Sequence, residues 1–353
     1  MRTADNRLAD YTTLRLGGPA RDFVRATTEE ELIAAVKLAD KAGQPVLILG
    51  GGSNLVVADD GFDGTVIQIA TKGVSAGREP GEVTVAAGED WDAVVAWTIA
   101  EGLAGLECLS GIPGLAGATP IQNVGAYGQE VSQTVTSVRT YDRLTGKTSI
   151  MPNEACGFAY RTSVFKRDNE RRHVVLAVTF TLAAAALSMP VGYAELAAAL
   201  GVQIGDQVAS TTVRSAVLEL RRRKGMVIDA DDPDTRSAGS FFVNPVLDAA
   251  EMTAVEAAAR ARCGEGTRVP RFDAGDGLFK VPAAWLIERA GFGKGYSLGD
   301  GARISSKHTL ALVNPGSAST AGLIALARQV RDGVREAFGV SLTPEPVLVG
   351  VTL

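Results

Sequence analysis

The chain has 353 residues, enough for two or three domains of ordinary size, so a small scaffold that depends on disulfides for its stability is excluded. It carries 35 Lys and Arg residues and 40 Asp and Glu residues, and its net charge of −5 supplies no basic field that would draw it onto nucleic acid or anionic lipid. Glycine is abundant, with 40 residues where the ordinary share of about 7% would give roughly 25. Much of the backbone is therefore expected in turns or close to a ligand.

The cysteines and the apolar segments indicate the compartment. Cys108, Cys156 and Cys263 are widely separated and form no CxxC motif, which favours free thiols in a reducing environment. The N-terminal residues lack the apolar core of a secretory signal, and the longest apolar stretch, residues 174–187, is too short to span a bilayer. The two histidines have no ligands at metal-binding spacing. We therefore expect a cytoplasmic protein without a metal centre or a membrane segment.

The first hundred residues predict alternating strands and helices. Apolar residues recur at helical spacing over 29–42, between strand-like segments at 23–24 and 46–49. A second such unit has a strand at 83–86 and a helix at about 90–101 that ends at Gly102. These patterns predict βαβ organisation at the start of the chain.

Further helices are predicted in the second half of the chain. They cover about 211–224, 248–262, 282–291 and 320–338, and a short strand at 346–352 follows them. Strand-rich segments give way to new helical patterns near residues 72 and 218. We therefore place domain boundaries at these two positions, which gives 1–72, 73–218 and 219–339, with 340–353 as a separate C-terminal strand.

Two glycine-rich stretches are candidates for ligand binding. The first, GGGSN at 50–54, directly follows the buried strand 46–49, so that backbone N–H groups can turn toward a phosphate; the alternative is a tight turn between two strands. It is neither GxGxxG nor a Walker loop, which argues against a kinase or ATPase. The second is the long stretch 107–127, which has no regular periodicity. Two such surfaces favour a long, flat, dianionic ligand such as a dinucleotide.

Five motifs are distinctive when they are taken together. In chain order they are ILGGGSNLVV (48–57), SGIPGLAGATPIQNVGAYGQEV (110–131), FAYRTSVFK (158–166), SAGSFFVNP (237–245) and TPEPV (343–347). Together they resemble the MurB family of UDP-N-acetylenolpyruvoylglucosamine reductases. The resemblance implies an α+β protein with a two-part FAD-binding domain of the vanillyl-alcohol-oxidase type, over 1–72 and 73–218, and a third α+β domain that binds substrate. The C-terminal strand, with Glu345, would return to the FAD-binding part. Tyr193 implies membership of the group with a tyrosine-bearing loop.

The resemblance assigns FAD binding to the two glycine-rich stretches. The matching positions are Gly50, Gly51, Gly52, Ser53, Asn54, Ile112, Pro113, Gly114, Gln122, Gly125 and Tyr127. No histidine precedes residue 173, and Cys108 lies outside the glycine motifs, so we expect a non-covalent flavin. NADPH is implied as the hydride donor. The sequence shows no separate dinucleotide fingerprint for it, as expected if NADPH and substrate use one cleft in turn.

The implied reaction adds hydride to an enolpyruvyl ether and leaves negative charge on the carbon that bears the carboxylate. Such chemistry needs a cation at the carboxylate, a polar group that holds the intermediate, and a proton donor. The family's catalytic motifs supply Arg161, Ser240 and Glu345, with Ser240 as the acid. Without the motifs, these residues would be interpreted as a loop arginine, a turn serine and an edge-strand carboxylate.

The resemblance assigns the UDP group to Tyr193, Lys224, Asn244 and Lys280. The basic run at 221–224 could instead suggest nucleic acid, but four cations at the end of a helix also favour its dipole. Many relatives have tyrosine where this chain has Phe272, and lysine where it has Val243. A direct phosphate contact at Phe272 is therefore in doubt, and phosphate neutralisation rests more on the two lysines.

The implied function is NADPH-dependent reduction of enolpyruvyl-UDP-N-acetylglucosamine to UDP-N-acetylmuramate, a step of peptidoglycan precursor synthesis. We expect a small-molecule substrate, no nucleic acid and a monomer. Two alternatives stay open, an oxygen-using sugar or alcohol oxidase on the same FAD fold and a nucleotide-binding regulatory protein without turnover. The absorption spectrum of a flavin, bleached by NADPH and restored by the enolpyruvyl nucleotide, distinguishes the three.

Overall fold

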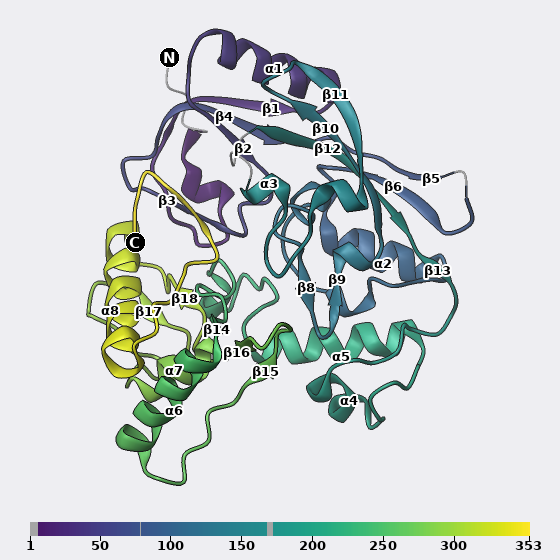
Figure 1. Ribbon diagram of the computed structural model, residues 1–353. Coiled ribbons are helices and arrows are strands. Elements are labelled where there is room, and N and C mark those ends of the chain that lie inside the picture. The colour runs from purple at the N-terminus through teal and green to yellow at the C-terminus, as the bar shows by residue number, and fades with distance from the viewer. Residues whose placement is uncertain (1–5, 78, 168–171) are drawn as a thin grey trace. The chain divides into compact units, whose positions relative to one another are not determined.

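The computed structural model describes residues 6–77, 79–167 and 172–353, which form two compact units (Figure 1). The first unit consists of residues 20–52 and 63–227 together with Asn6. The second is assembled from three separate stretches, 7–19, 53–62 and 228–353. The three-part division predicted above stays a prediction.

The first unit contains most of the strands. Its elements are β1 (Ala20–Ala26), α1 (Glu29–Lys41), β2 (Val46–Leu49), β4 (Phe62–Ile69), β5 (Val74–Ala76), β6 (Glu82–Ala86), α2 (Trp91–Ala100), β7 (Leu103–Ala104), β8 (Gly125–Ala126), β9 (Gln129–Glu130), β10 (Val135–Asp142), β11 (Lys147–Pro152), α3 (Val164–Arg167), β12 (His173–Thr181), β13 (Ala183–Ala184), α4 (Ala194–Leu200) and α5 (Ser210–Arg223).

Two sheets organise the first unit. One has the strand order β1-β4-β2, in which β2 and β4 are parallel, and the other is a five-stranded sheet with the order β11-β10-β12-β6-β5, whose neighbouring strands are antiparallel (Figure 1). Alternate residues of β6 and most of β12 are buried, as expected for strands with one face on a core. On this buried face, the ring centre of Phe180 in β12 lies 5.8 Å from that of Trp91 in α2.

Helix α1 has an N-terminal cap and one apolar face, which together explain why this segment is helical. The Thr28 side chain accepts a hydrogen bond from the Glu31 backbone N–H, and the Glu31 carboxylate accepts one from the Thr27 N–H. Leu32, Val36 and Ala39 form its buried face. Ion pairs from Arg139 and Arg143 to acidic residues of α1 connect the helix to β10 and the turn after it. The helix therefore packs on apolar residues and is held to the sheet by charge.

The second unit is mainly helical. Its elements are β3 (Leu55–Val57), β14 (Val246–Leu247), α6 (Ala249–Cys263), β15 (Phe272–Asp273), β16 (Phe279–Lys280), α7 (Ala283–Arg289), β17 (Arg303–Ile304), β18 (Leu312–Val313), α8 (Thr320–Phe338) and β19 (Val347–Val349).

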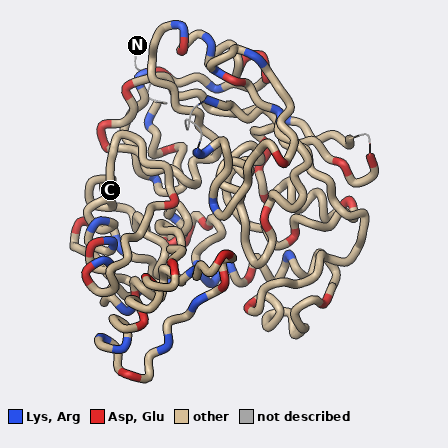
Figure 2. The backbone as a smooth tube through the Cα atoms, in the orientation of Figure 1, with Lys and Arg blue, Asp and Glu red and all other residues tan. Residues whose placement is uncertain are grey.

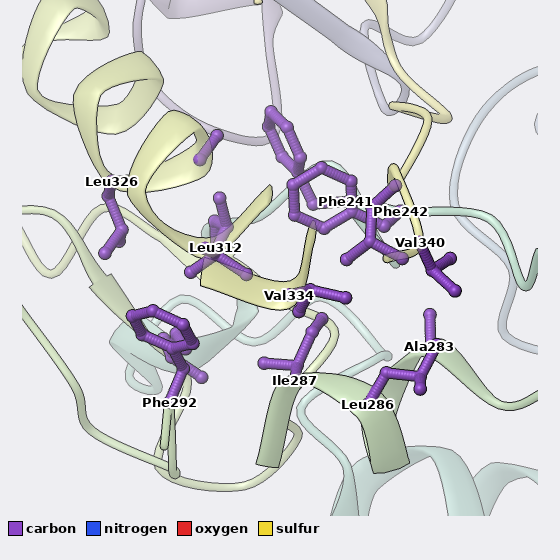
Figure 3. Close-up of a cluster of buried hydrophobic side chains, with 14 of the residues drawn as sticks. Phe241, Phe242, Ala283, Leu286, Ile287, Phe292, Leu312, Leu326, Val334 and Val340 are labelled. Atoms are coloured by element: carbon purple, nitrogen blue, oxygen red, sulfur yellow. The ribbon is translucent and has the colours of Figure 1, made fainter. Parts of the chain in front are cut away.

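A single large apolar cluster forms the core of the second unit. It takes residues from α6, α7 and α8 and from the segment that carries Phe241 and Phe242, and Figure 3 shows the two phenylalanine rings beside Val340. β19 pairs in parallel with β3, which follows the first glycine-rich loop. This pairing brings residues from both ends of the sequence together.

The predicted elements are present, with ends that differ by at most a few residues. The helix predicted at 90–101 is α2, and those at 211–224, 248–262, 282–291 and 320–338 are α5, α6, α7 and α8. The long stretch 107–127 has only short 3₁₀ turns and the two-residue strand β8. Figure 2 shows acidic and basic residues interspersed along the backbone, in keeping with the small net charge. Within the described ranges, none of the helices has both the length and the apolar character of a membrane span.

Candidate functional site

The two glycine-rich stretches meet in the first unit. A Cβ added to Gly51 would lie 2.8 Å from the Cα of Gly114, which is closer than real side chains come. Gly114 itself has a φ of +124°, a conformation that favours glycine. The loop after β2 and the loop after α2 therefore touch backbone to backbone, and the bare peptide groups that result suit a diphosphate.

Helix α2 holds the second glycine-rich stretch at three points. The Trp91 backbone N–H donates to the Gly114 carbonyl (3.0 Å), and its buried indole N–H donates to the Leu109 carbonyl (3.2 Å). The Asp92 carboxylate accepts from the Gly111 N–H and from both terminal nitrogens of Arg214 on α5. Burial alone would raise the pKa of Asp92, but these hydrogen bonds lower it, so the carboxylate stays charged. The loop is thus pre-formed.

Arg221 provides an unsatisfied donor beside this stretch. Its guanidinium donates to the Met226 carbonyl (2.8 Å), while its buried Nε has no hydrogen-bond acceptor among the described residues. A Cβ on Gly111 would lie 3.5 Å from that Nε. Burial lowers the pKa of Arg221 to about 10, so it remains a cation at neutral pH. A buried, unpaired N–H next to a glycine backbone fits an acceptor atom of a bound ligand.

Arg161 lies against the end of the second glycine-rich stretch. It has a left-handed backbone conformation, with φ of +55°, in a turn between Ala159 and Thr162. Its guanidinium donates to the Gly125 carbonyl (2.8 Å) and the Asn123 carbonyl (3.5 Å) and lies 5.3 Å from the centre of the Tyr160 ring. The structure therefore brings one predicted catalytic residue to a predicted cofactor loop.

Tyr127, Tyr193 and Lys224 form one cluster. The rings of Tyr127 and Tyr193 meet edge to face at 5.7 Å, and the Lys224 ammonium lies 5.7 Å from the centre of the Tyr127 ring. Lys224 also pairs with Glu195 of α4 at 2.7 Å. Burial raises the pKa of Tyr127 to about 12 and also raises that of Tyr193, so both hydroxyls are donors at neutral pH. Two residues predicted for the substrate thus lie beside one predicted for the cofactor.

A buried carboxylate connects the segments that carry these residues. Glu107 is completely buried and accepts hydrogen bonds from the Gly105 N–H, the Gln129 side chain and the Met189 N–H. It therefore connects the start of the glycine-rich stretch to β9 and to the segment before α4. Burial, assisted by the charge of Glu107, raises the pKa of Cys108 to about 12. Cys108 is thus a thiol at neutral pH and a poor nucleophile.

Ser240 and Glu345 lie on adjacent segments of the second unit. The Glu345 N–H donates to the carbonyl of Phe241 (2.9 Å), and the Val243 N–H donates to the carbonyl of Thr343 (3.1 Å). Asn54 joins them, since its side chain donates to the Glu345 carbonyl (3.4 Å). Backbone hydrogen bonds therefore join the segments that carry the two predicted catalytic residues of this unit, next to the buried Phe241 and Phe242.

Asn244 and Lys280 are placed by the small sheet β14-β16-β15. The Asn244 side-chain oxygen accepts from the Ala283 N–H at the start of α7 (2.9 Å). Lys280 is directly opposite Phe272 across the strand pair, so the two residues, eight apart in sequence, are neighbours on one face. Phe272 is 56% exposed. Phe272 is therefore beside a lysine that is predicted to bind phosphate.

The predicted site residues fall into both units. The first unit contains Gly50, Gly51, Gly52, Ile112, Pro113, Gly114, Gln122, Gly125, Tyr127, Arg161, Tyr193 and Lys224, and the second contains Ser53, Asn54, Ser240, Asn244, Lys280 and Glu345. Sequence reasoning missed Glu107, Asn123, Glu195 and Arg221. Only Asn123, in the middle of the motif PIQNVGAYG, had a usable signal, because asparagine tolerates a left-handed backbone.

The fold and the two glycine loops define a class of protein, the FAD-binding flavoproteins. The model of an FAD-binding domain matches residues 20–150, and the α+β fold class predicted from the sequence is confirmed. The model of the UDP-N-acetylenolpyruvoylglucosamine reductase C-terminal domain matches residues 231–349.

Individual relatives narrow this class to one family. The chain is 57% identical to the UDP-N-acetylenolpyruvoylglucosamine reductase of Streptomyces avermitilis over 99% of this chain and 95% of that protein, and 56% identical to that of Thermobifida fusca over 98% and 97%. The crystal structure of the MurB reductase of Thermus caldophilus superposes with a TM-score of 0.65 at 26% identity, covering 97% of each chain. The chain belongs to the UDP-N-acetylenolpyruvoylglucosamine reductase (MurB) family.

Proposed function

We propose that the chain is an FAD-dependent reductase that uses NADPH to convert enolpyruvyl-UDP-N-acetylglucosamine into UDP-N-acetylmuramate for peptidoglycan synthesis. The observation that carries this proposal is identity of 57% to a reductase of that name over 99% of the chain. The backbone contact between the two glycine loops supports FAD as the cofactor. An alcohol or sugar oxidase is a weaker candidate, because the C-terminal domain model that matches residues 231–349 is specific to the reductase.

The cofactor-binding residues would be those of the two glycine loops. Residues 50–54 and 112–114, with Gln122, Gly125 and Tyr127, would hold FAD, and Arg221 would supply a further N–H donor. When bound, FAD would take hydride from NADPH and deliver it to the methylene carbon of the enolpyruvyl group. The high pKa of the buried Cys108 thiol supports non-covalent binding.

Arg161, Ser240 and Glu345 would manage the charge that hydride addition creates. Arg161 would bind the substrate carboxylate, since a guanidinium is a permanent, planar cation that grips a carboxylate through two hydrogen bonds. Ser240 would donate its hydroxyl proton to the carbon that bears the carboxylate. The new C–H bond would complete the reduction of the carbon–carbon double bond. Glu345 would hold the charged intermediate in place through a polar contact. A serine hydroxyl is a weak acid, but a carbanion is basic enough to take its proton.

Four residues would bind the UDP group. Lys224 and Lys280 would neutralise the diphosphate as point charges. Tyr193 would donate its hydroxyl, which its raised pKa keeps protonated. Asn244 would contribute its amide.

An anaerobic two-step absorption experiment tests the proposed function. The purified protein, loaded with FAD, is first titrated with NADPH and then with the enolpyruvyl nucleotide. We expect the flavin band to bleach in the first step and to return in the second, with UDP-N-acetylmuramate as the product. The proposal would be contradicted if the protein did not bind FAD, or if the flavin band returned only when oxygen was admitted.

We also propose that the protein acts in the cytoplasm as a monomer and binds no nucleic acid. The small negative net charge and the interspersed charges of Figure 2 support the last point. Sedimentation equilibrium at micromolar concentration should give a mass near that of one chain. A stable dimer, or retention on a nucleic-acid column at moderate salt, would contradict this part of the proposal.

A further inference from the structure

Asn123 is a buried polar residue in the first unit that connects three separate segments. It is 1% exposed and has a left-handed backbone, with φ of +47°. Its side-chain oxygen accepts from the Ser132 N–H (3.1 Å), and its amide nitrogen donates to the Glu130 carboxylate (2.8 Å) and to the Ala159 carbonyl (3.2 Å). These three bonds use the oxygen and both N–H groups of the carboxamide, so the side chain is held in one orientation.

The bond to Ala159 attaches Asn123 to the turn that carries Arg161. Ala159 and Thr162 exchange two backbone hydrogen bonds, of 3.0 and 3.2 Å, and Arg161 lies between them with its left-handed φ. The Asn123 amide therefore holds the base of this turn. A residue in a sparsely populated backbone region persists only where its surroundings enforce it, and the Asn123 amide is one such constraint.

The main chain of the same loop holds the other end of Arg161. The carbonyls of Asn123 and Gly125 accept from the two terminal guanidinium nitrogens. Glu130, the partner of the Asn123 amide, is directly opposite Gly125 in the β8–β9 pair. The base of the turn and the guanidinium of Arg161 are thus both held by hydrogen bonds to the loop that contains Asn123 and Gly125.

We propose that Asn123 is a positioning residue for Arg161. By holding the turn with its amide and the guanidinium with its loop carbonyls, it sets the direction in which the planar cation faces the substrate carboxylate. This inference rests on the proposed function of Arg161. Bidentate recognition depends on orientation within about 10–20°, and a displacement of about 1 Å can cost on the order of a hundredfold.

The experiment compares two ligands that differ in the lactyl group, which carries the carboxylate. UDP-N-acetylmuramate carries it, and UDP-N-acetylglucosamine lacks it. Binding of each to the oxidised, FAD-loaded enzyme is measured by titration calorimetry. The variant Asn123→Asp keeps the shape and tolerance of the left-handed backbone but turns a carboxylate toward Glu130 and the Ala159 carbonyl. Asn123→Gly, which also keeps the backbone conformation, removes the side chain alone.

We expect both variants to bind UDP-N-acetylmuramate at least about tenfold more weakly, with binding of UDP-N-acetylglucosamine within about twofold of the unsubstituted protein. Arg161→Ala should show the same selectivity, and adding Asn123→Gly to it should cause no further loss, because both changes remove one interaction. The matched control is Asn153→Asp. The Asn153 amide also donates to two backbone carbonyls, those of Ser132 and Val135, and this variant should not change the ratio of the two affinities.

Each other outcome has a definite meaning. Equal weakening of both ligands, unchanged binding of both, or loss of FAD in both Asn123 variants would show a general structural role and overturn the positioning role. If Arg161→Ala itself fails to distinguish the two ligands, the function proposed for Arg161 is wrong, and the positioning role falls with it. If Arg161→Ala distinguishes them and the Asn123 variants do not, only the positioning role is wrong.

Discussion

Single residues in unusual backbone conformations lie at the candidate site. Asn123, Tyr127 and Arg161 are three of the five described non-glycine residues with positive φ, and all three belong to the loop or turn assigned to cofactor and substrate. Such conformations cost of order 1–3 kcal/mol each and tend to occur where function requires them. Composition and periodicity could not reveal these conformations, because they depend on contacts such as the bond between Asn123 and Ala159.

Gly51 allows a prediction about cofactor affinity. In Gly51→Ala the new methyl group would approach the Gly114 backbone at 2.8 Å and force the two loops apart. We expect FAD to bind at least about tenfold more weakly, because a loop displaced by about 1 Å loses its oriented N–H donors. The dissociation constant is measured by flavin fluorescence. Gly266→Ala is the control, since a Cβ there meets nothing within 4 Å, and equal effects of the two changes would contradict the prediction.

Ser240 allows a prediction about the two half-reactions. A positioned proton donor is worth roughly 10²–10⁴ in rate, so Ser240→Ala should slow flavin reoxidation by the enolpyruvyl nucleotide by that factor. Reduction by NADPH needs no such proton and should keep its rate. Stopped-flow absorbance measures both steps. Ser215→Ala, which changes a serine that donates to the Thr211 carbonyl of its own helix, is the control. A loss shared equally by both steps would remove the acid role from Ser240.

At the scale of elements, the helices could be predicted and the strand partners could not. The apolar residues of α1, α5 and α8 recur at helical spacing, so the residues of each helix are enough to predict it. The C-terminal strand was also expected, but its parallel partner β3 lies almost three hundred residues earlier, and no local pattern specifies that pairing. The β8–β9 pair and the 159–162 turn were likewise absent from the prediction, because they are shorter than any periodicity.

Strand β19 begins two residues after Glu345 and allows a prediction about how Glu345 is positioned. The Val347 N–H donates to the Asn54 carbonyl at 2.9 Å, and Val347→Pro removes that N–H. We expect flavin reoxidation by the substrate to slow at least about tenfold, as expected for a displacement of about 1 Å at Glu345. Val347→Ala retains the N–H and is the control, because the Val347 side chain lies partly in solvent, with 37% exposure. Full activity of Val347→Pro would show that β19 does not position Glu345.

The end of β10 allows a prediction about acid stability. The hydrogen bond from the Arg172 guanidinium, with others from backbone N–H groups, holds the pKa of Asp142 well below its ordinary 3.8. A carboxylate whose pKa is lowered by folding stabilises the folded state. This stabilisation is fully present above the pKa of the unfolded state and is lost as pH falls through the pKa of the folded state. Asp142→Asn should therefore lower Tm at pH 6, and its difference from the parent should shrink steadily below pH 4.

The exposed ion pair of Asp63 with Arg21 provides the control for Asp142. Both side chains are largely in water, so Asp63→Asn should change Tm very little at any pH. Thermal unfolding followed by circular dichroism between pH 2 and pH 7 measures both variants. A constant Tm difference for Asp142→Asn across this range would contradict the predicted linkage.

At the scale of the whole molecule, the second unit is discontinuous in sequence. Leu14, Leu16 and Val56 are buried in the same cluster as residues of α6, α7 and α8, although both of their segments interrupt the first unit. The long stretch of the second unit begins at residue 228, and the sequence boundary predicted near residue 218 stays a prediction. That boundary could not reveal the two short insertions, because apolar residues in short segments carry no sign of which core they join.

A fragment of residues 228–353 should therefore fail to fold alone. It would lack three buried residues of its core and the parallel partner of β19. Burying each such side chain contributes about 1.5–3 kcal/mol, a large part of the stability of a small domain. Near-ultraviolet circular dichroism and amide exchange should show no fixed packing in the fragment, with the full chain as the control. A cooperative unfolding transition in the fragment would contradict the prediction.

During translation, β3 leaves the ribosome long before its partner exists. Asn54 and Glu345 are separated by 291 residues. At roughly 5–20 residues per second, this separation is a wait of about 15–60 s. The contact between Gly51 and Gly114 of the first unit can form in that interval, whereas the segments that carry Ser240 and Glu345 cannot pair until the last strand has been made. On the roles proposed for these residues, the nascent chain can bind FAD before its proton-donating site is complete.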